Sequence, residues 1–238
     1  MNWTPFELDS QPPVRGFVHR PHDLSGDGLV LTHGAGSNCE APLLVAVATA
    51  FAEAGFAVLR CNLPFRQVRR HGPPRPGEAA ESRKGLRNAV DALRTRGPGG
   101  PFKRIFLGGH SYGGRQATIL AAEDEELATR IGGLLLLSYP LHPPGKPAQL
   151  RTAHFPTLRK PALFVHGSRD AFGSLDEMEA ALKLVPARTS LLPVEGAGHE
   201  LGFGRPTRRA KAVNLDVLGR LVVAFQELAR DRGPGETE

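Results

Sequence analysis

The stretch that decides the fold is Arg104-Ile105-Phe106-Leu107-Gly108-Gly109, followed directly by His110-Ser111-Tyr112-Gly113-Gly114. The first six residues form an apolar run typical of a buried strand, and residues 112–122 have the apolar spacing of a helix. Ser111 therefore lies on a sharp strand-to-helix turn, where glycines on both sides accommodate the crowded backbone. Such a turn exposes the hydroxyl and aims free helix amides at it, so we predict a nucleophile elbow. An ordinary turn is the alternative.

The same alternation of apolar run and helix extends outward in both directions. Further strands are expected at 28–33, 56–61, 133–138, 162–166 and 189–194, and further helices at 42–53, 79–96, 175–184 and 206–229. Residues 5–20 should add one or two strands that are antiparallel to the rest. Strands that are apolar on both faces and followed by helices indicate a mostly parallel sheet covered on both sides. We predict a single α/β domain of seven or eight strands over residues 1–230, with a disordered tail at 231–238.

A base for the serine is expected on a later loop, because reactive residues gather at the carboxyl ends of parallel strands. Gly196-Ala197-Gly198-His199-Glu200 follows the last predicted strand and precedes the last helix. The small residues around His199 leave its imidazole room to reach over the sheet edge. We therefore predict that His199 is the base, with an ordinary surface-loop histidine as the alternative.

An acid is needed to orient that imidazole and to stabilise its charged form. Asp170 lies just beyond the strand that precedes the strand of the histidine, in His166-Gly167-Ser168-Arg169-Asp170. The resulting chain order of Ser, Asp and His is known for such triads. We predict that Asp170 is the acid; a solvated loop aspartate is the alternative, and Asp176 and Glu177 are weaker candidates.

An acyl-transfer site also needs two donors aimed at the developing oxyanion. The backbone N–H of Tyr112, next to the nucleophile, should be one. The other is expected from the glycine-rich loop His33-Gly34-Ala35-Gly36-Ser37-Asn38, with Ala35 as the favoured donor. A phosphate-binding loop is disfavoured, because no Lys-Ser or Lys-Thr pair follows these glycines.

The walls of a substrate pocket should come from the loops that follow the strands. The residues that we expect to bind substrate are Gly36, Asn62, Phe65, Arg66, Tyr139 and His142. Arg115, one turn into the helix after the nucleophile, is expected to pair with a carboxylate inside the protein, or alternatively to reach an anion on the substrate.

Composition limits the other classes of function. The formal net charge is +6, but the basic residues are scattered apart from clusters at 66–71 and 205–209. Neither cluster is interleaved with aromatic residues, so no nucleic-acid partner is expected. Solvated surface is the favoured interpretation of both clusters, and an anionic substrate or partner stays open.

No apolar run is long enough to cross a membrane, and no secretory signal is apparent, so a cytoplasmic protein is expected. Cys39 and Cys61 have no metal-like spacing, and no metal is expected.

Together these motifs resemble the α/β-hydrolase superfamily. They are His33–Asn38, Arg60-Cys61-Asn62-Leu63-Pro64-Phe65, Gly109–Arg115, His166–Asp170 and Gly196–His199. More narrowly, they are similar to its small lidless branch, which includes dienelactone-hydrolase-like proteins and the hydrolase-like domain of a subunit of the NSL histone-acetyltransferase complex. The resemblance spans residues 25–230 and implies a triad of Ser111, His199 and Asp170 with no cofactor. Dienelactone hydrolases proper carry Cys where this chain has Ser111, so their substrate is not carried over.

The function that these features favour is hydrolysis of a small carboxylic ester or related acyl compound through an acyl-serine intermediate. A non-catalytic binding or scaffold protein that keeps the hydrolase architecture is the alternative from another class. Cleavage of short peptides is a third possibility. The connection at 138–161 is too short for a full lid domain, which disfavours a large interfacial lipase.

Overall fold

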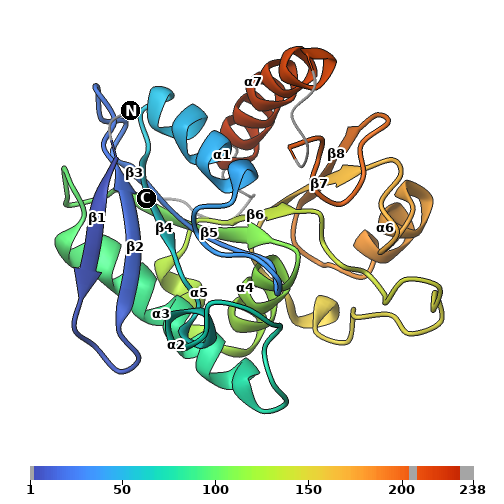
Figure 1. Ribbon diagram of the computed structural model, residues 1–238, viewed down its shortest axis with the longest axis horizontal. Coiled ribbons are helices and arrows are strands. Elements are labelled where there is room, and N and C mark those ends of the chain that lie inside the picture. Colours follow the sequence, from blue (N-terminus) through green and yellow to red (C-terminus); the bar gives the residue numbers. More distant parts are fainter. Residues whose placement is uncertain (1–2, 204–207, 231–238) are drawn as a thin grey trace.

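The computed structural model describes residues 3–203 and 208–230 (Figure 1). Within these ranges every predicted strand and helix is present, and no described end differs from its predicted position by more than two residues. The predicted tail at 231–238 and the predicted start of the last helix at 206 lie outside the described residues.

The strands form one eight-stranded sheet in the order β1-β2-β4-β3-β5-β6-β7-β8. Their bounds are β1 (Trp3–Leu8), β2 (Val14–His19), β3 (Asp27–Thr32), β4 (Ala57–Cys61), β5 (Arg104–His110), β6 (Leu134–Leu137), β7 (Ala162–Gly167) and β8 (Thr189–Val194). From β4 to β8 every neighbouring pair is parallel. β2 is antiparallel to both β1 and β4, so β1 again runs in the direction of the parallel strands. The expectation that the added strands are antiparallel to the rest therefore holds for β2 alone.

Helices cover both faces of this sheet (Figure 1). The helices are α1 (Pro42–Glu53), α2 (Pro64–Val68), α3 (Glu78–Arg96), α4 (Tyr112–Glu123), α5 (Glu125–Arg130), α6 (Leu175–Leu182) and α7 (Arg208–Arg230), with the 3-10 turn η1 (Phe155–Thr157). The core has two parts, because successive strand side chains point to opposite faces. In β3, Leu29 and Leu31 pack with α1 and α7, whereas Val30 packs with α3 and α4.

Strand order brings the loops after β3 and β5 together. The chain runs from β3 outward to β4 and then returns to the other side of β3 as β5. In such a sheet, ligands bind where the strand order reverses. Thr32 at the end of β3 pairs with Gly109 of β5, so the loop predicted to bind the oxyanion and the loop that carries Ser111 start side by side.

Three short elements were not predicted. α2 occupies the first part of the loop expected at 64–77, and α5 follows α4 directly. η1 is the one helical segment in the connection from β6 to β7. That connection holds no lid domain.

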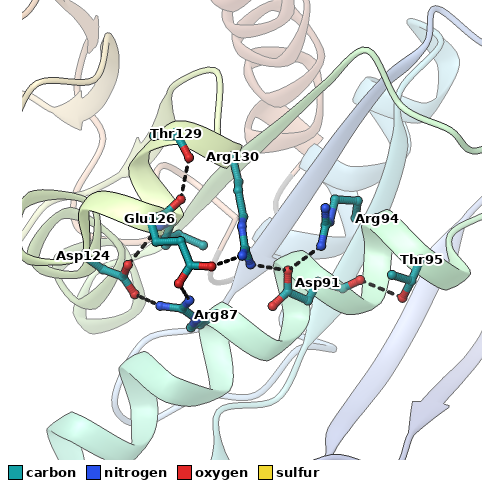
Figure 2. Close-up of polar contacts among 9 residues, drawn as sticks. Arg87, Asp91, Arg94, Thr95, Asp124, Glu126, Thr129 and Arg130 are labelled. Carbon is teal, nitrogen blue, oxygen red and sulfur yellow. Dashed lines mark hydrogen bonds and ion pairs between the residues drawn. The ribbon is translucent and has the colours of Figure 1, made fainter.

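An ion network fastens α5 to α3 (Figure 2). Arg87 of α3 pairs with Asp124 and Glu126 at the start of α5. Arg130 of α5 pairs with Glu126 and, at 3.0 Å, with Asp91 of α3. Because α5 continues from α4, the network also fixes the far end of the helix that begins at the nucleophile.

In the ranges 3–203 and 208–230, no helix has both the length and the apolar character required to cross a membrane.

Candidate active site

Ser111 lies on a tight turn between the central strand β5 and α4. Its backbone has φ 50° and ψ −116°, a conformation that residues other than glycine seldom adopt. The Ser111 N–H donates to Leu137 O at 2.8 Å, which anchors the turn to the end of β6. Close packing explains the glycine that follows: a Cβ on Gly113 would lie 2.6 Å from both His33 O and the Thr32 side chain.

The three residues of the predicted triad are brought together from three loops. His199 Nε2 lies 2.8 Å from Ser111 Oγ. On the other side of the ring, Nδ1 lies 2.8 Å and 3.0 Å from the two carboxylate oxygens of Asp170. In this arrangement Nδ1–H donates to the carboxylate, which leaves Nε2 free to accept the serine proton.

Asp170 is held in its ionised form. Its side chain has no exposed surface, and burial alone would raise the pKa of the carboxyl. Hydrogen bonds from His199 and from the Phe172 N–H, which donates to Oδ1 at 2.9 Å, outweigh burial, so the pKa of Asp170 lies below its usual value. An ionised carboxylate is the form that can stabilise a protonated His199.

Two residues that the sequence analysis did not assign hold His199 in place. The Phe172 ring lies 4.3 Å from the imidazole at a tilt of 31°. His110 Nε2 lies 2.9 Å from the backbone carbonyl O of His199. The position of His110 beside Ser111 was visible in the sequence, but the loop that it contacts comes from a distant part of the chain.

The loop after β3 is braced by one histidine. His33 Nδ1 donates to Gly34 O at 2.8 Å, and His33 Nε2 accepts from the Leu63 N–H at 3.1 Å. This pattern requires a neutral ring, in agreement with burial, which lowers the pKa of His33 to about 4. Within the described chain, the N–H groups of Ala35 and Tyr112 have no hydrogen-bond partner, so both amides are available as donors.

Arg66, predicted to bind substrate, instead holds this loop through its guanidinium. Nε donates to Ser37 O at 2.7 Å, and one terminal nitrogen donates to Ala35 O at 3.0 Å and to Gly72 O at 2.8 Å. The other terminal nitrogen donates to Arg69 O. Because its contacts are backbone carbonyls, Arg66 ties the α2 region to the loop after β3.

Three further residues near the loop after β3 were predicted to bind substrate, and each has a different environment. Asn62 Oδ1 accepts from the Cys39 N–H at 2.9 Å. Phe65 is buried and makes an edge contact with Tyr112, with 6.0 Å between ring centroids. A Cβ on Gly36 would meet no atom within 4 Å, so this residue borders open space.

Tyr139 and His142 follow β6 but are buried. The Tyr139 side chain packs against Phe155 and Phe164, and its hydroxyl donates to Arg151 O at 2.6 Å. His142 lies between Pro143 O at 2.8 Å and a Glu177 carboxylate oxygen at 3.3 Å. Their side chains therefore support the connection from β6 to β7.

A pocket of about 300 Å³ lies beside α2, between residues of the β1–β2 turn and α3. Phe65 contributes to it, but none of the three triad residues does. Within the described residues, no group of three or more His, Cys, Asp or Glu side chains could hold a metal ion.

Comparison with known proteins identifies the family. A family model described as "Alpha/beta hydrolase domain" matches residues 26–227. The chain belongs to this family. The predicted α/β-hydrolase fold is thereby confirmed, with an eight-stranded, mostly parallel sheet and helices on both faces. The likeness to the NSL-complex subunit stays a prediction.

Solved structures share the fold of this α/β hydrolase. A dienelactone hydrolase from Anabaena variabilis is 20% identical, with a TM-score of 0.71 over 95% of this chain and 99% of that one. An α/β serine hydrolase without lid from Xanthomonas campestris is 17% identical, with a TM-score of 0.72 over 98% of each chain. An α/β serine hydrolase homologue from Coxiella burnetii is 15% identical, with a TM-score of 0.72 over 93% and 97%.

Proposed function

We propose that this α/β hydrolase cleaves a small carboxylic ester or related acyl compound through an acyl-serine intermediate. One observation carries the proposal: a single imidazole, that of His199, lies 2.8 Å from Ser111 Oγ and 2.8 Å from a carboxylate oxygen of Asp170. This chain of hydrogen bonds from serine through histidine to aspartate is what activates a serine hydroxyl as a nucleophile. Membership of the hydrolase family supports the same reaction class.

The reaction proceeds in two halves. Ser111 Oγ attacks the carbonyl carbon while His199 Nε2 takes the hydroxyl proton, and the N–H groups of Tyr112 and Ala35 stabilise the oxyanion. The carbon–oxygen bond to the leaving group breaks, and the alcohol departs with the proton from His199. Water then attacks the acyl-serine, His199 again takes a proton and returns it to Ser111, and the carboxylic acid leaves. Asp170 keeps Nδ1–H directed at itself and stabilises the charged ring throughout.

A fluorophosphonate probe tests this chemistry, because it labels only an activated serine. We expect the wild type to be labelled, and Ser111→Ala and His199→Ala to be labelled about 10³-fold more slowly or not at all. Turnover of p-nitrophenyl acetate should fall in parallel. His71→Ala, which changes an exposed histidine, is the control.

Two results would contradict the proposal. If the folded wild type is not labelled, and its p-nitrophenyl acetate turnover equals that of the alanine variants, the triad is not used and the scaffold alternative is favoured. If labelling succeeds but short peptides are cleaved faster than esters, the active serine stands and the substrate class changes to peptides. A panel of acyl chain lengths then defines the preference.

A further inference from the structure

Arg115 lies one helical turn after the nucleophile. The backbone N–H of Arg115 donates to the backbone carbonyl O of Ser111 at 3.0 Å, in the first turn of α4. Four residues of helix rise correspond to about 6 Å. In helices the Cα–Cβ bonds tilt toward the N-terminus, and α4 begins at the end of β5 (Figure 1). Arg115 is half-buried at this edge of the sheet.

The guanidinium of Arg115 lacks the partner that the sequence analysis favoured. Within the part of the chain that the structure describes, Arg115 forms no ion pair with an acidic side chain, and its buried Nε has no hydrogen-bond partner. A cation in the first turn of a helix also opposes the helix dipole. The site thus combines two unfavourable features, a buried unpaired donor and an unfavourable charge position, which an anion would relieve.

A second arginine, Arg151, lies near enough to Arg115 for the two charges to act on each other. Burial, followed by the charge of Arg115, lowers the pKa of Arg151, which itself forms no ion pair in the described ranges. Burial and Arg115 together lower the pKa of His154 to about 4, so this ring is neutral. Its Nε2 lies 2.8 Å from Thr118 Oγ1, on the same helix as Arg115. Burial raises the pKa of the Tyr139 hydroxyl, and Arg115 opposes that rise most strongly.

These residues come from two segments that pack against each other. Arg115 and Thr118 belong to α4, whereas Tyr139, Arg151 and His154 belong to the connection from β6 to β7. The two segments meet where η1 packs on α4. Arg151 is tied to the residues that follow β6, because its backbone N–H donates to Leu141 O at 2.8 Å and its carbonyl O accepts from the Tyr139 hydroxyl at 2.6 Å. Since β6 is parallel to β5, these residues lie at the same edge of the sheet as Ser111.

We propose that Arg115, supported by Arg151, binds a carboxylate on the substrate, so that the preferred ester or acyl compound is an anion. This inference rests on the proposed function and names its substrate class. A guanidinium presents a planar fork of donors that matches a carboxylate. The spacing of one helical turn places this carboxylate a few bonds from the carbonyl that Ser111 attacks.

The test compares matched esters that differ in one charge. For a carboxylate on the acyl side, the pair is the 4-nitrophenyl half-ester of adipic acid and the 4-nitrophenyl ester of adipamic acid. For a carboxylate on the alcohol side, the pair is 4-acetoxybenzoate and 4-acetoxybenzamide. The readout is the ratio of kcat/KM for the anionic ester over the neutral one, after subtraction of the rate with Ser111→Ala protein.

We expect the wild type to prefer the anionic member of at least one pair by about tenfold or more, as one charge-assisted hydrogen bond provides. The pair that shows the preference identifies the side of the ester. Arg115→Gln should bring the ratio close to one, and Arg115→Lys and Arg151→Gln should lower it partly. Arg94→Gln removes one exposed arginine charge on α3 and should keep the wild-type ratio.

Two outcomes would overturn the inference. One is a wild-type ratio of one or less in both pairs; the other is an equal ratio in Arg115→Gln and Arg94→Gln. If no ester is hydrolysed, the proposed function fails, and the carboxylate site is tested alone by calorimetric titration of Ser111→Ala protein with adipate. Adipate affinity that falls fivefold or more with Arg115→Gln then supports the site, whereas an unchanged or undetectable affinity overturns it. Circular dichroism of each variant checks that it is folded, and Arg151→Gln replaces any Arg115 variant that is not.

Discussion

His110 Nε2 lies 2.9 Å from the backbone carbonyl O of His199, so the residue before the nucleophile holds the loop that carries the base. Burial lowers the pKa of His110, which keeps the ring neutral with one N–H to donate. The two imidazoles lie 5.0 Å apart between centroids. The end of β5 therefore presents Ser111 and, through His110, also fixes the loop that carries His199. His110 is thus a positioning residue.

Replacement of His110 should reduce catalysis more than substrate binding. In His110→Ala the His199 carbonyl loses its donor, and a displacement of about 1 Å in the base can lower kcat about a hundredfold. We expect a fall of about ten- to a hundredfold in kcat for p-nitrophenyl acetate with little change in KM. His110→Gln, which can donate from its amide, should recover part of the loss. Equal kcat values for wild type and His110→Ala would exclude this positioning role.

The backbone of Ser111 should be a source of strain that glycine relieves. At φ 50° and ψ −116° a Cβ is unfavourable, and such conformations cost about 1–3 kcal/mol. Ser111→Gly and Ser111→Ala both remove the hydroxyl, so their difference isolates the Cβ. We expect Ser111→Gly to have a free energy of unfolding about 1 kcal/mol higher than Ser111→Ala in urea titrations. If Ser111→Ala is the more stable variant, the turn is not strained.

Gly113 and Gly219 should respond to alanine in opposite directions. A Cβ at Gly113 would lie 2.6 Å from His33 O, a backbone atom that cannot move without the loop after β3. Gly113→Ala should therefore lose about 2–3 kcal/mol in the free energy of unfolding. Gly219 lies inside α7, where a Cβ meets no atom within 4 Å. Gly219→Ala should gain about 0.5–1 kcal/mol from helix propensity. Thermal or urea unfolding of both variants checks the sign of each effect.

Two buried histidines, His19 and His33, and the half-buried His154 should make the protein sensitive to mild acid. Burial is the main cause that lowers the pKa of His19, His33 and His154 to about 4, against 6.5 in the unfolded chain. Above pH 6.5 the rings are neutral in both states. Between pH 6.5 and 4 only the unfolded state takes up protons, so stability should fall as the pH falls through this window.

The slope of the free energy of unfolding against pH gives the number of protons that the protein takes up when it unfolds. Urea unfolding at several pH values should give a slope approaching about three protons or more near pH 5, because His110, whose pKa burial also lowers, adds to the contribution of these three rings. His154→Gln should reduce the slope by about one proton, whereas the exposed His71→Ala should leave it unchanged. A free energy of unfolding that stays constant between pH 6.5 and 4.5 would show that these rings titrate normally in the folded protein.

The amino-acid sequence by itself determined the elements and the reactive candidates. Apolar runs bounded by glycine and proline predicted the strands, and the glycines around Ser111 predicted the turn, because these signals depend on neighbours along the chain. Position after a strand also selected Asp170 and His199, since all parallel strands of one sheet end at the same edge.

Only the tertiary structure decided what each side chain contacts at that edge. It brought His199 between Ser111 and Asp170, directed the Arg66 donors to backbone carbonyls, and buried Tyr139. Among the described residues it also left Arg115 without an acidic partner, where the sequence favoured an internal ion pair. The reason is physical: hydrogen bonds and burial depend on which loops the strand order makes neighbours, and residues far apart in the chain carry no local signal of that proximity.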